Sequence, residues 1–160
     1  MMKKEEIANV CTFTGHRPER LSASEDAVID WLKNEIKTAV DEGYTDFITG
    51  MARGVDIWAA EEVLRLKSEG VKLRLIAASP FMGMDRDWNR EWQKRYKNII
   101  DNADEVHYIS AVPGRRAFFE RNEWMVDRAA KLIAVYTGAP GGTKKTIEYA
   151  KKHNRVIVKF

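Results

Sequence analysis

Cysteine is nearly absent from this 160-residue chain, and long apolar runs are absent altogether. Because Cys11 stands alone, an intramolecular disulfide and a thiolate-rich metal site are excluded, and we expect the reducing cytoplasm. The longest purely apolar stretches are about as long as residues 132–136, whereas a membrane span needs about 20 apolar residues. No apolar signal-peptide core follows the charged N-terminus, so we expect neither secretion nor a membrane partner.

The chain also lacks a strong excess of one charge and a cluster of histidines. Lys and Arg number 27 against 24 Asp and Glu, which gives a net charge of +3. This mildly basic balance permits an anionic ligand but does not demand nucleic acid. His16, His107 and His153 stand far apart, so we expect no zinc site. Because no linker or repeat interrupts the sequence, residues 1–160 are predicted to form a single domain.

Short apolar segments alternate with longer amphipathic ones. Two short segments, 132–135 and 156–158, are continuously apolar, which is typical of strands covered on both faces of a parallel sheet. The alternation predicts a three-layer α/β domain, with a mostly parallel sheet of about six strands and helices on both faces. The expected strands are residues 8–13, 46–49, 72–78, 105–110, 132–137 and 155–159. The expected helices are residues 22–42, 55–69, 85–102, 116–130 and 143–153.

Two of the expected helices carry local signals. Residues 22–25 read Ser-Ala-Ser-Glu, which predicts a capping box at the start of the first helix. In the third helix, Trp88, Trp92 and Tyr96 recur every four residues. Base stacking is one interpretation of this stripe. The spacing is more typical of a helix that packs its aromatic face on the sheet or on a second subunit.

The loops that follow the strands are where a site is expected, because doubly wound sheets bind ligands at the carboxyl ends of their strands. Most of the ten glycines lie in these loops, together with many basic side chains. Glycine lets backbone N–H groups approach a ligand, and helix N-termini add partial positive charge, so the combination favours a phosphate-bearing ligand. For any one loop, turn chemistry is an equally good explanation. The loops are residues 14–20, 50–56, 79–84, 111–116 and 138–143.

Two common nucleotide-binding fingerprints are missing. The chain contains neither G-x-G-x-x-G nor G-x-x-x-x-G-K-[ST]. Residues 141–146, Gly-Gly-Thr-Lys-Lys-Thr, are similar to a P-loop only superficially. The usual dinucleotide site and a P-loop NTPase are therefore not expected.

Three blocks of the sequence carry a family resemblance. They read Thr-Phe-Thr-Gly-His-Arg-Pro at 12–18, Thr-Gly-Met-Ala-Arg-Gly-Val-Asp at 49–56, and Gly-Ala-Pro-Gly-Gly-Thr-Lys-Lys-Thr at 138–146. In this order and spacing they resemble the YpsA-like family of the SLOG superfamily. That superfamily also includes the DNA-processing protein A (Smf) proteins and the LOG phosphoribohydrolases. The resemblance implies a Rossmann-like fold, a homo-oligomer, and a ligand such as ADP-ribose, NAD or an adenine nucleotide.

The DNA-processing proteins suggest one alternative function. Residues 49–56 are similar to their Ser-Gly-x-Ala-x-Gly-Ile-Asp segment, and residues 142–146 to their Gly-[ST]-x-x-Thr segment. Those proteins bind single-stranded DNA. This resemblance implies a single-stranded nucleic-acid binding module.

The LOG enzymes suggest a second alternative function. The resemblance implies that Arg121 and Glu148 are catalytic, because the matching pair in those enzymes cleaves an N-glycosidic bond in a nucleoside 5′-monophosphate. Lys144, Lys145 and Asn122 depart from the LOG motifs, so the phosphate loop is expected to take a different shape. Glu148 is also placed to pair with Lys144, four residues away on the same helix. This alternative is an N-glycosidase.

Several loop residues have both a binding and a structural interpretation. Asp56 is placed either to contact ribose or phosphate or to complement a helix N-terminus. Thr143 is a natural N-cap, and His16 is a candidate polar contact. Together the patterns favour a nucleotide or nucleotide-derivative binding protein that acts as a sensor or adaptor. The residues expected to bind the ligand are Thr14, Gly15, His16, Arg17, Gly50, Arg53, Gly54, Asp56, Gly138, Gly141, Gly142, Thr143 and Thr146.

Overall fold

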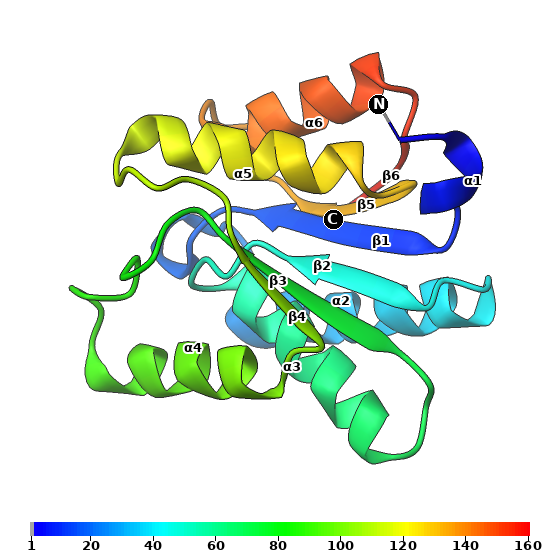
Figure 1. The fold of residues 1–160 in the computed structure, drawn as a ribbon, viewed down its shortest axis with the longest axis horizontal. Helices are drawn as coiled ribbons and strands as arrows, with labels where there is room; N and C mark the ends of the chain where they lie inside the picture. Colours follow the sequence, from blue (N-terminus) through cyan, green and yellow to red (C-terminus); the bar gives the residue numbers. More distant parts are fainter. Residues whose placement is uncertain (1) are drawn as a thin grey trace.

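All six strands of the sheet run parallel, with β1 and β2 at its centre (Figure 1). This computed structural model describes residues 2–160. The strand order is β4-β3-β2-β1-β5-β6, so the direction in which strands are added reverses between β1 and β5. The strands are β1 (Val10–Gly15), β2 (Asp46–Thr49), β3 (Arg74–Ser79), β4 (Glu105–Tyr108), β5 (Lys131–Val135) and β6 (Val156–Lys159).

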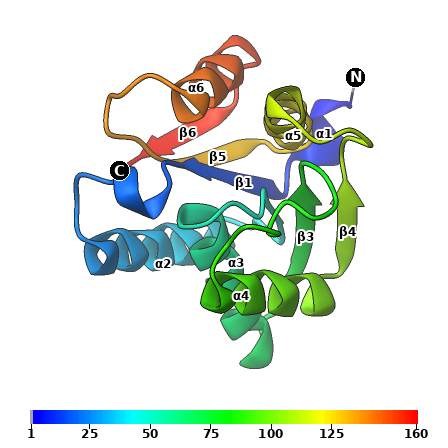
Figure 2. The ribbon, with the colours of Figure 1, turned by 90° about the vertical axis from the view of Figure 1, so that its left-hand side faces the viewer.

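Helices cover both faces of the sheet. α2, α3 and α4 lie on one face, and α5 and α6 lie on the other (Figures 1 and 2). This division follows from the connections, because right-handed crossovers place their helices on one face until the strand order reverses. The helices are α1 (Lys4–Ile7), the 3₁₀ helix η1 (Pro18–Arg20), α2 (Glu25–Asp41), α3 (Val55–Ser68), α4 (Arg90–Asn102), α5 (Arg115–Asp127) and α6 (Gly142–Lys152).

The three-layer α/β architecture predicted from the sequence is confirmed, and the sheet is parallel throughout. The segments 132–135 and 156–158 form the neighbouring strands β5 and β6. The prediction that both are covered on both faces holds for β5 but is wrong for β6, because β6 is an edge strand and Val156 is 56% exposed. The short helices α1 and η1 lie outside the prediction, because elements of 4 and 3 residues show no apolar period. In residues 2–160, no helix is long and apolar enough to cross a membrane.

Two helices begin later than the sequence predicts. Ser24, rather than Ser22, caps α2 through its side chain. Asn89 caps α4 by accepting a hydrogen bond from the backbone N–H of Trp92, so this helix begins at Arg90 and not at the predicted residue 85. In both cases the helix starts where a side chain reaches a first-turn N–H group, and apolar spacing alone does not identify that residue.

The aromatic side chains Trp92 and Tyr96 of α4 pack inward, together with Trp88 in the turn before this helix. The Trp92 ring lies 6.2 Å from the ring of Trp58 on α3. Trp88 meets Tyr96 edge to face at 5.6 Å, and the Tyr96 hydroxyl lies 2.8 Å from Oγ of Ser79 at the end of β3. These contacts fix α4 against α3 and the sheet, as the packing interpretation predicts.

The carboxyl end of β1 lies very close to the first residue of α3. A Cβ atom added to Gly15 would lie 2.4 Å from Cγ2 and 2.7 Å from Cβ of Val55. A methyl group at this position therefore forces the strand and the helix apart. The close approach brings the start of α3 beside the end of β1, at the edge of the sheet where a ligand is expected.

Replacing Gly15 with alanine is expected to lower the free energy of unfolding by about 1–3 kcal/mol. The branched Val55 side chain sits directly on the helix backbone and has no rotamer that clears the added methyl group. Urea denaturation measures the change. Gly142→Ala is the matched control, because its Cβ would meet Asn122 at an ordinary 3.9 Å. A loss for Gly15→Ala no larger than the control's would contradict the close packing.

Candidate functional site

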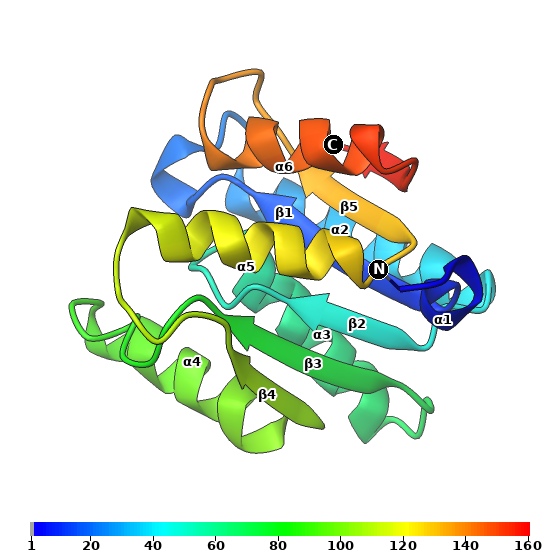
Figure 3. The same ribbon diagram turned by 45° about the horizontal axis from the view of Figure 1, so that its top comes forward.

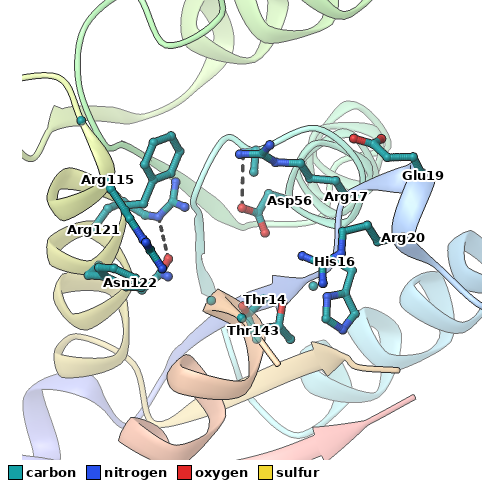
Figure 4. A pocket seen from close by; sticks show the side chains of 17 residues that line it. Thr14, His16, Arg17, Glu19, Arg20, Asp56, Arg115, Arg121, Asn122 and Thr143 are labelled. Atoms are coloured by element: carbon teal, nitrogen blue, oxygen red, sulfur yellow. Dashed lines mark hydrogen bonds between the residues drawn. The ribbon is translucent and has the colours of Figure 1, made fainter. Parts of the chain in front are cut away.

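A cavity of about 630 Å³ opens at the carboxyl end of the sheet. Its walls come from the loops after β1 and β2 and from the first turns of α5 and α6 (Figure 4). Those two helices begin at the same end of the molecule as the strands finish (Figure 3). The cavity therefore lies where the strand order reverses, and its volume is in the range of about 300–1,000 Å³ common for small-molecule sites.

Glycines precede three helices at this end of the sheet. Gly54, Gly114 and Gly141 are the N-cap residues of α3, α5 and α6, with φ angles of 93°, 136° and 139°. These angles favour glycine, and none of the three residues caps its helix with a side chain. The first backbone N–H groups of α5 and α6 therefore stay available at the cavity wall, together with the positive partial charge of each helix N-terminus.

Basic side chains surround the cavity. Its arginines are Arg17, Arg20, Arg115 and Arg121. Arg53 does not line it, because this side chain pairs with Glu19 at 2.9 Å. Arg20 reaches across to the carbonyl of Pro140 at 3.4 Å. These two contacts connect the η1 segment to the β2–α3 loop on one side and to the β5–α6 loop on the other.

Asp56 is buried in the wall of the cavity with half of its carboxylate unpartnered. Its Oδ2 accepts the backbone N–H of Ala52 at 3.3 Å. Its Oδ1 has no hydrogen-bond partner among residues 2–160. Burial raises the pKa of Asp56 to about 6, although the charge of Arg121 acts in the opposite direction. At neutral pH the site thus holds a buried carboxylate whose hydrogen-bonding capacity is only partly used.

Arg121 lies beside this carboxylate but directs hydrogen bonds elsewhere. Its Nε donates to the Asn122 side chain at 2.8 Å, and its Nη1 donates to the carbonyl of Gly50. A Cβ atom at Gly50 would lie 2.7 Å from Oδ2 of Asp56 and 3.1 Å from the Arg121 guanidinium. Gly50 therefore allows both charged groups to approach the end of β2. In Figure 4, Arg17, Asp56 and Arg121 come together from three separate elements.

His16 is a buried hydrogen-bonding group at the end of β1. Its Nε2 lies 3.1 Å from the Thr137 hydroxyl, and its ring stacks on Tyr136 at 5.7 Å. Burial, followed by the charge of Arg20, lowers the pKa of His16. The imidazole is therefore neutral at pH 7, so it can accept or donate a hydrogen bond without adding charge.

Of the residues predicted from the sequence, some line the cavity and others do not. Those that line it are Thr14, Gly15, His16, Arg17, Asp56, Arg121, Gly141, Gly142 and Thr143. Those that do not are Gly50, Arg53, Gly54, Gly138, Thr146 and Glu148.

The residues outside the cavity have other contacts. Gly54 packs on Pro18, and Thr146 donates to the carbonyl of Gly142 at 2.8 Å. Thr146 also lines a smaller cavity of about 330 Å³ between α5 and α6. Glu148 is exposed and lies 4.0 Å from Lys144. The structure thus does not bring Glu148 to the cavity that contains Arg121.

One side of α5 forms a wall of the cavity, and its residues beyond the expected loop at 111–116 were not predicted from the sequence. Its residues repeat at intervals of three and four, which is the signal that identifies one face of a helix. Gly114, Glu19, Arg20 and Ala52 complete the additional lining. The α5 residues are Arg115, Phe118, Phe119 and Asn122.

Comparison with known proteins assigns the chain to a family. Residues 11–157 match the family described as the YspA SLOG family (YpsA). The chain belongs to this family. It is 28% identical over 155 residues to a UPF0398 protein of Halalkalibacterium halodurans, covering 91% of this chain and 82% of that protein. It is 31% identical over 138 residues to the SPbeta prophage-derived protein YoqJ of Bacillus subtilis, covering 76% of this chain and 81% of YoqJ.

Two solved structures share the fold. DNA processing protein A from Helicobacter pylori superposes with a TM-score of 0.66 and 19% identity, covering 98% of this chain and 68% of that one. DNA processing protein A from Streptococcus pneumoniae superposes with a TM-score of 0.60 and 18% identity, covering 94% of this chain and 50% of that one. The H. pylori structure is described for its single-stranded DNA binding mode. At this identity the likeness shows the fold alone.

Replacing Asp56 with asparagine is expected to stabilise the unliganded protein at pH 7.5 by about 2–3 kcal/mol, because the raised pKa is a cost of burying the charge. Near pH 4 the carboxyl is mostly protonated when folded and only partly ionised when unfolded, so the gain should nearly vanish. It should grow as the pH rises and be complete above about pH 7. Urea denaturation between pH 4 and pH 8 measures it.

Asp30→Asn is the matched control, because Asp30 is exposed on α2. It should change stability by less than about 0.5 kcal/mol at every pH. A destabilised Asp56→Asn at pH 7.5, or a gain that does not depend on pH, would contradict the assignment of Asp56 as a buried, under-bonded carboxylate.

Proposed function

We propose that this protein binds a nucleotide or nucleotide derivative of the ADP-ribose or NAD type in the 630 Å³ cavity, and that it acts as a sensor or adaptor. The observation that carries the proposal is the convergence of two glycine-capped helix N-termini and several arginines on one cavity. Free N–H groups and fixed positive charge together form an anion site.

The first turn of α6 is the best-equipped place for a phosphate. Gly141, Gly142 and Thr143 line the cavity there, with no side chain capping the helix. Gly142 has an ordinary φ angle, and a Cβ atom there would meet only Nδ2 of Asn122 at 3.9 Å, so a ligand can approach its backbone closely. The start of α5 contributes a second set of N–H groups and the Arg115 side chain. Two such sets suit a diphosphate, as in ADP-ribose or NAD.

The remainder of the cavity has aromatic and neutral polar groups. Phe118 and Phe119 line it from α5, and Thr14 and His16 line it from β1 and the loop that follows. Aromatic faces with a few polar groups are what a nucleoside needs for packing and for orientation.

The N-glycosidase alternative has less support. General acid–base chemistry requires both catalytic groups at one scissile bond. Arg121 lines the cavity, whereas Glu148 does not and is exposed beside Lys144. A binding role without turnover therefore accounts better for the arrangement.

Single-stranded nucleic acid is the second candidate, and the shared fold with DNA processing protein A favours it. Its phosphates would use the same cationic helix starts. The two candidates differ in salt dependence, since the affinity for a single strand falls by about 0.7 log units per log unit of salt for each phosphate contacted. A nucleotide held by one or two phosphates should respond much less.

Substituting Gly142 with aspartate is expected to abolish nucleotide binding while keeping the helix intact. Thermal shift of the full chain measures this against AMP, ADP-ribose, NAD and a single-stranded oligonucleotide. A ligand present at 100 times its dissociation constant should raise the free energy of unfolding of the wild-type protein by about 2.7 kcal/mol. This corresponds to a rise of several degrees in the melting temperature. An acidic side chain at a helix start is favourable for folding but repels phosphate.

Gly142→Ala measures the effect of adding a side chain without charge, and its shift should lie between those of wild type and Gly142→Asp. A wild-type shift in Gly142→Asp would refute a phosphate site at α6. A wild-type response to the oligonucleotide alone, with a steep salt dependence, would replace the proposal with the nucleic-acid candidate.

A further inference from the structure

We infer that Asp56 accepts hydrogen bonds from the ribose hydroxyls of the ligand, which makes the cavity selective for ribonucleotides over deoxyribonucleotides. This inference rests on the proposed nucleotide-binding function. It adds the sugar as the recognised group and names the residue that recognises it.

The bonding of the carboxylate leaves room for a ligand. Asp56 is 6% exposed and lines the cavity, yet its Oδ1 has no partner in residues 2–160. Its Oδ2 accepts only from Ala52 and so keeps accepting capacity. A buried acceptor without a donor is costly, and the remaining source of donors is the cavity itself.

The neighbouring arginine does not supply that donor. Arg121 donates from Nε to the Asn122 side chain and from Nη1 to the Gly50 carbonyl. Among the described residues, no ion pair within 4.0 Å joins Arg121 to Asp56. Gly50 allows this arrangement, because any side chain there would collide with the Asp56 carboxylate. The guanidinium therefore offsets part of the charge of Asp56 and leaves Oδ1 without a hydrogen-bond donor.

Charge decides which part of a nucleotide can occupy this position. A phosphate placed against Asp56 would set two anions together in a poorly hydrated site, which costs several kcal/mol. The phosphate belongs instead at Gly141 and Gly142, where N–H groups are free. The group that meets Asp56 must be a neutral donor, and the ribose, attached directly to the phosphate, carries two adjacent hydroxyls. A carboxylate can accept from both hydroxyls of such a pair.

The experiment compares AMP, 2′-deoxy-AMP, 3′-deoxy-AMP and inosine monophosphate by isothermal titration calorimetry at pH 7.5. The proteins are wild-type full chain, Asp56→Asn and the control Asp30→Asn. Wild type and Asp30→Asn should bind AMP and inosine monophosphate about tenfold or more tightly than either deoxy compound, because a lost hydroxyl leaves the buried acceptor unpaired. In Asp56→Asn the preference for the ribo form should shrink to about threefold or less.

Three results overturn the inference in distinguishable ways. Equal affinity of wild type for AMP and both deoxy compounds, with tight binding throughout, removes the ribose contact and leaves the proposed function standing. Binding of AMP and its deoxy forms but not of inosine monophosphate assigns Asp56 to the base amino group instead. No binding of any of the four compounds, together with no thermal shift by ADP-ribose or NAD, removes the proposed function and the inference together. A thermal shift by ADP-ribose or NAD without binding of the four compounds removes the inference and leaves the proposed function standing. If Asp56→Asn does not fold, the wild-type ratio of AMP to deoxy compounds alone decides.

Discussion

The positive φ angles of Gly114 and Gly141 are the constraint on which the site depends. Each lets the chain enter a helix at the carboxyl edge of the sheet without a side chain over the first N–H groups. Because the strand order reverses beside β1, the loops after β1 and β5 diverge and leave a cavity between them. The cavity and the two uncapped helix starts are thus consequences of one arrangement of turns.

The charged pair of Asp56 and Arg121 destabilises the unliganded protein. Asp56 and Arg121 are both buried at the cavity, and burial raises the pKa of the first and lowers that of the second. Neither group has its hydrogen bonds completed by the other. A pair of this kind weakens the unliganded fold, which is the usual cost of arranging polar groups for a ligand before it arrives. In the proposed function, ligand selectivity and stability are therefore opposed at this position.

The sequence predicted the strands because short apolar segments such as 132–135 and 156–158 alternate with longer amphipathic ones. Four of the five loops that it named for a ligand line the cavity, whereas the loop at residues 79–84 does not. The sequence could not distinguish Arg53 from the arginines that line the cavity. Arg53 forms an ion pair with Glu19, and these two residues lie 34 positions apart in the sequence. The burial of Asp56 depends on packing between elements, and no local pattern carries that information.

The most direct test is backbone amide chemical-shift mapping by NMR on isotopically labelled full chain titrated with ADP-ribose. The account predicts that the largest shifts fall on residues 114–116 and 141–143, whose N–H groups lie at the starts of α5 and α6. The amino ends of the strands, at the opposite edge of the sheet, should hardly change. Largest shifts at that opposite edge, or none at saturating ADP-ribose, would contradict an anion site built from glycine-capped helix starts.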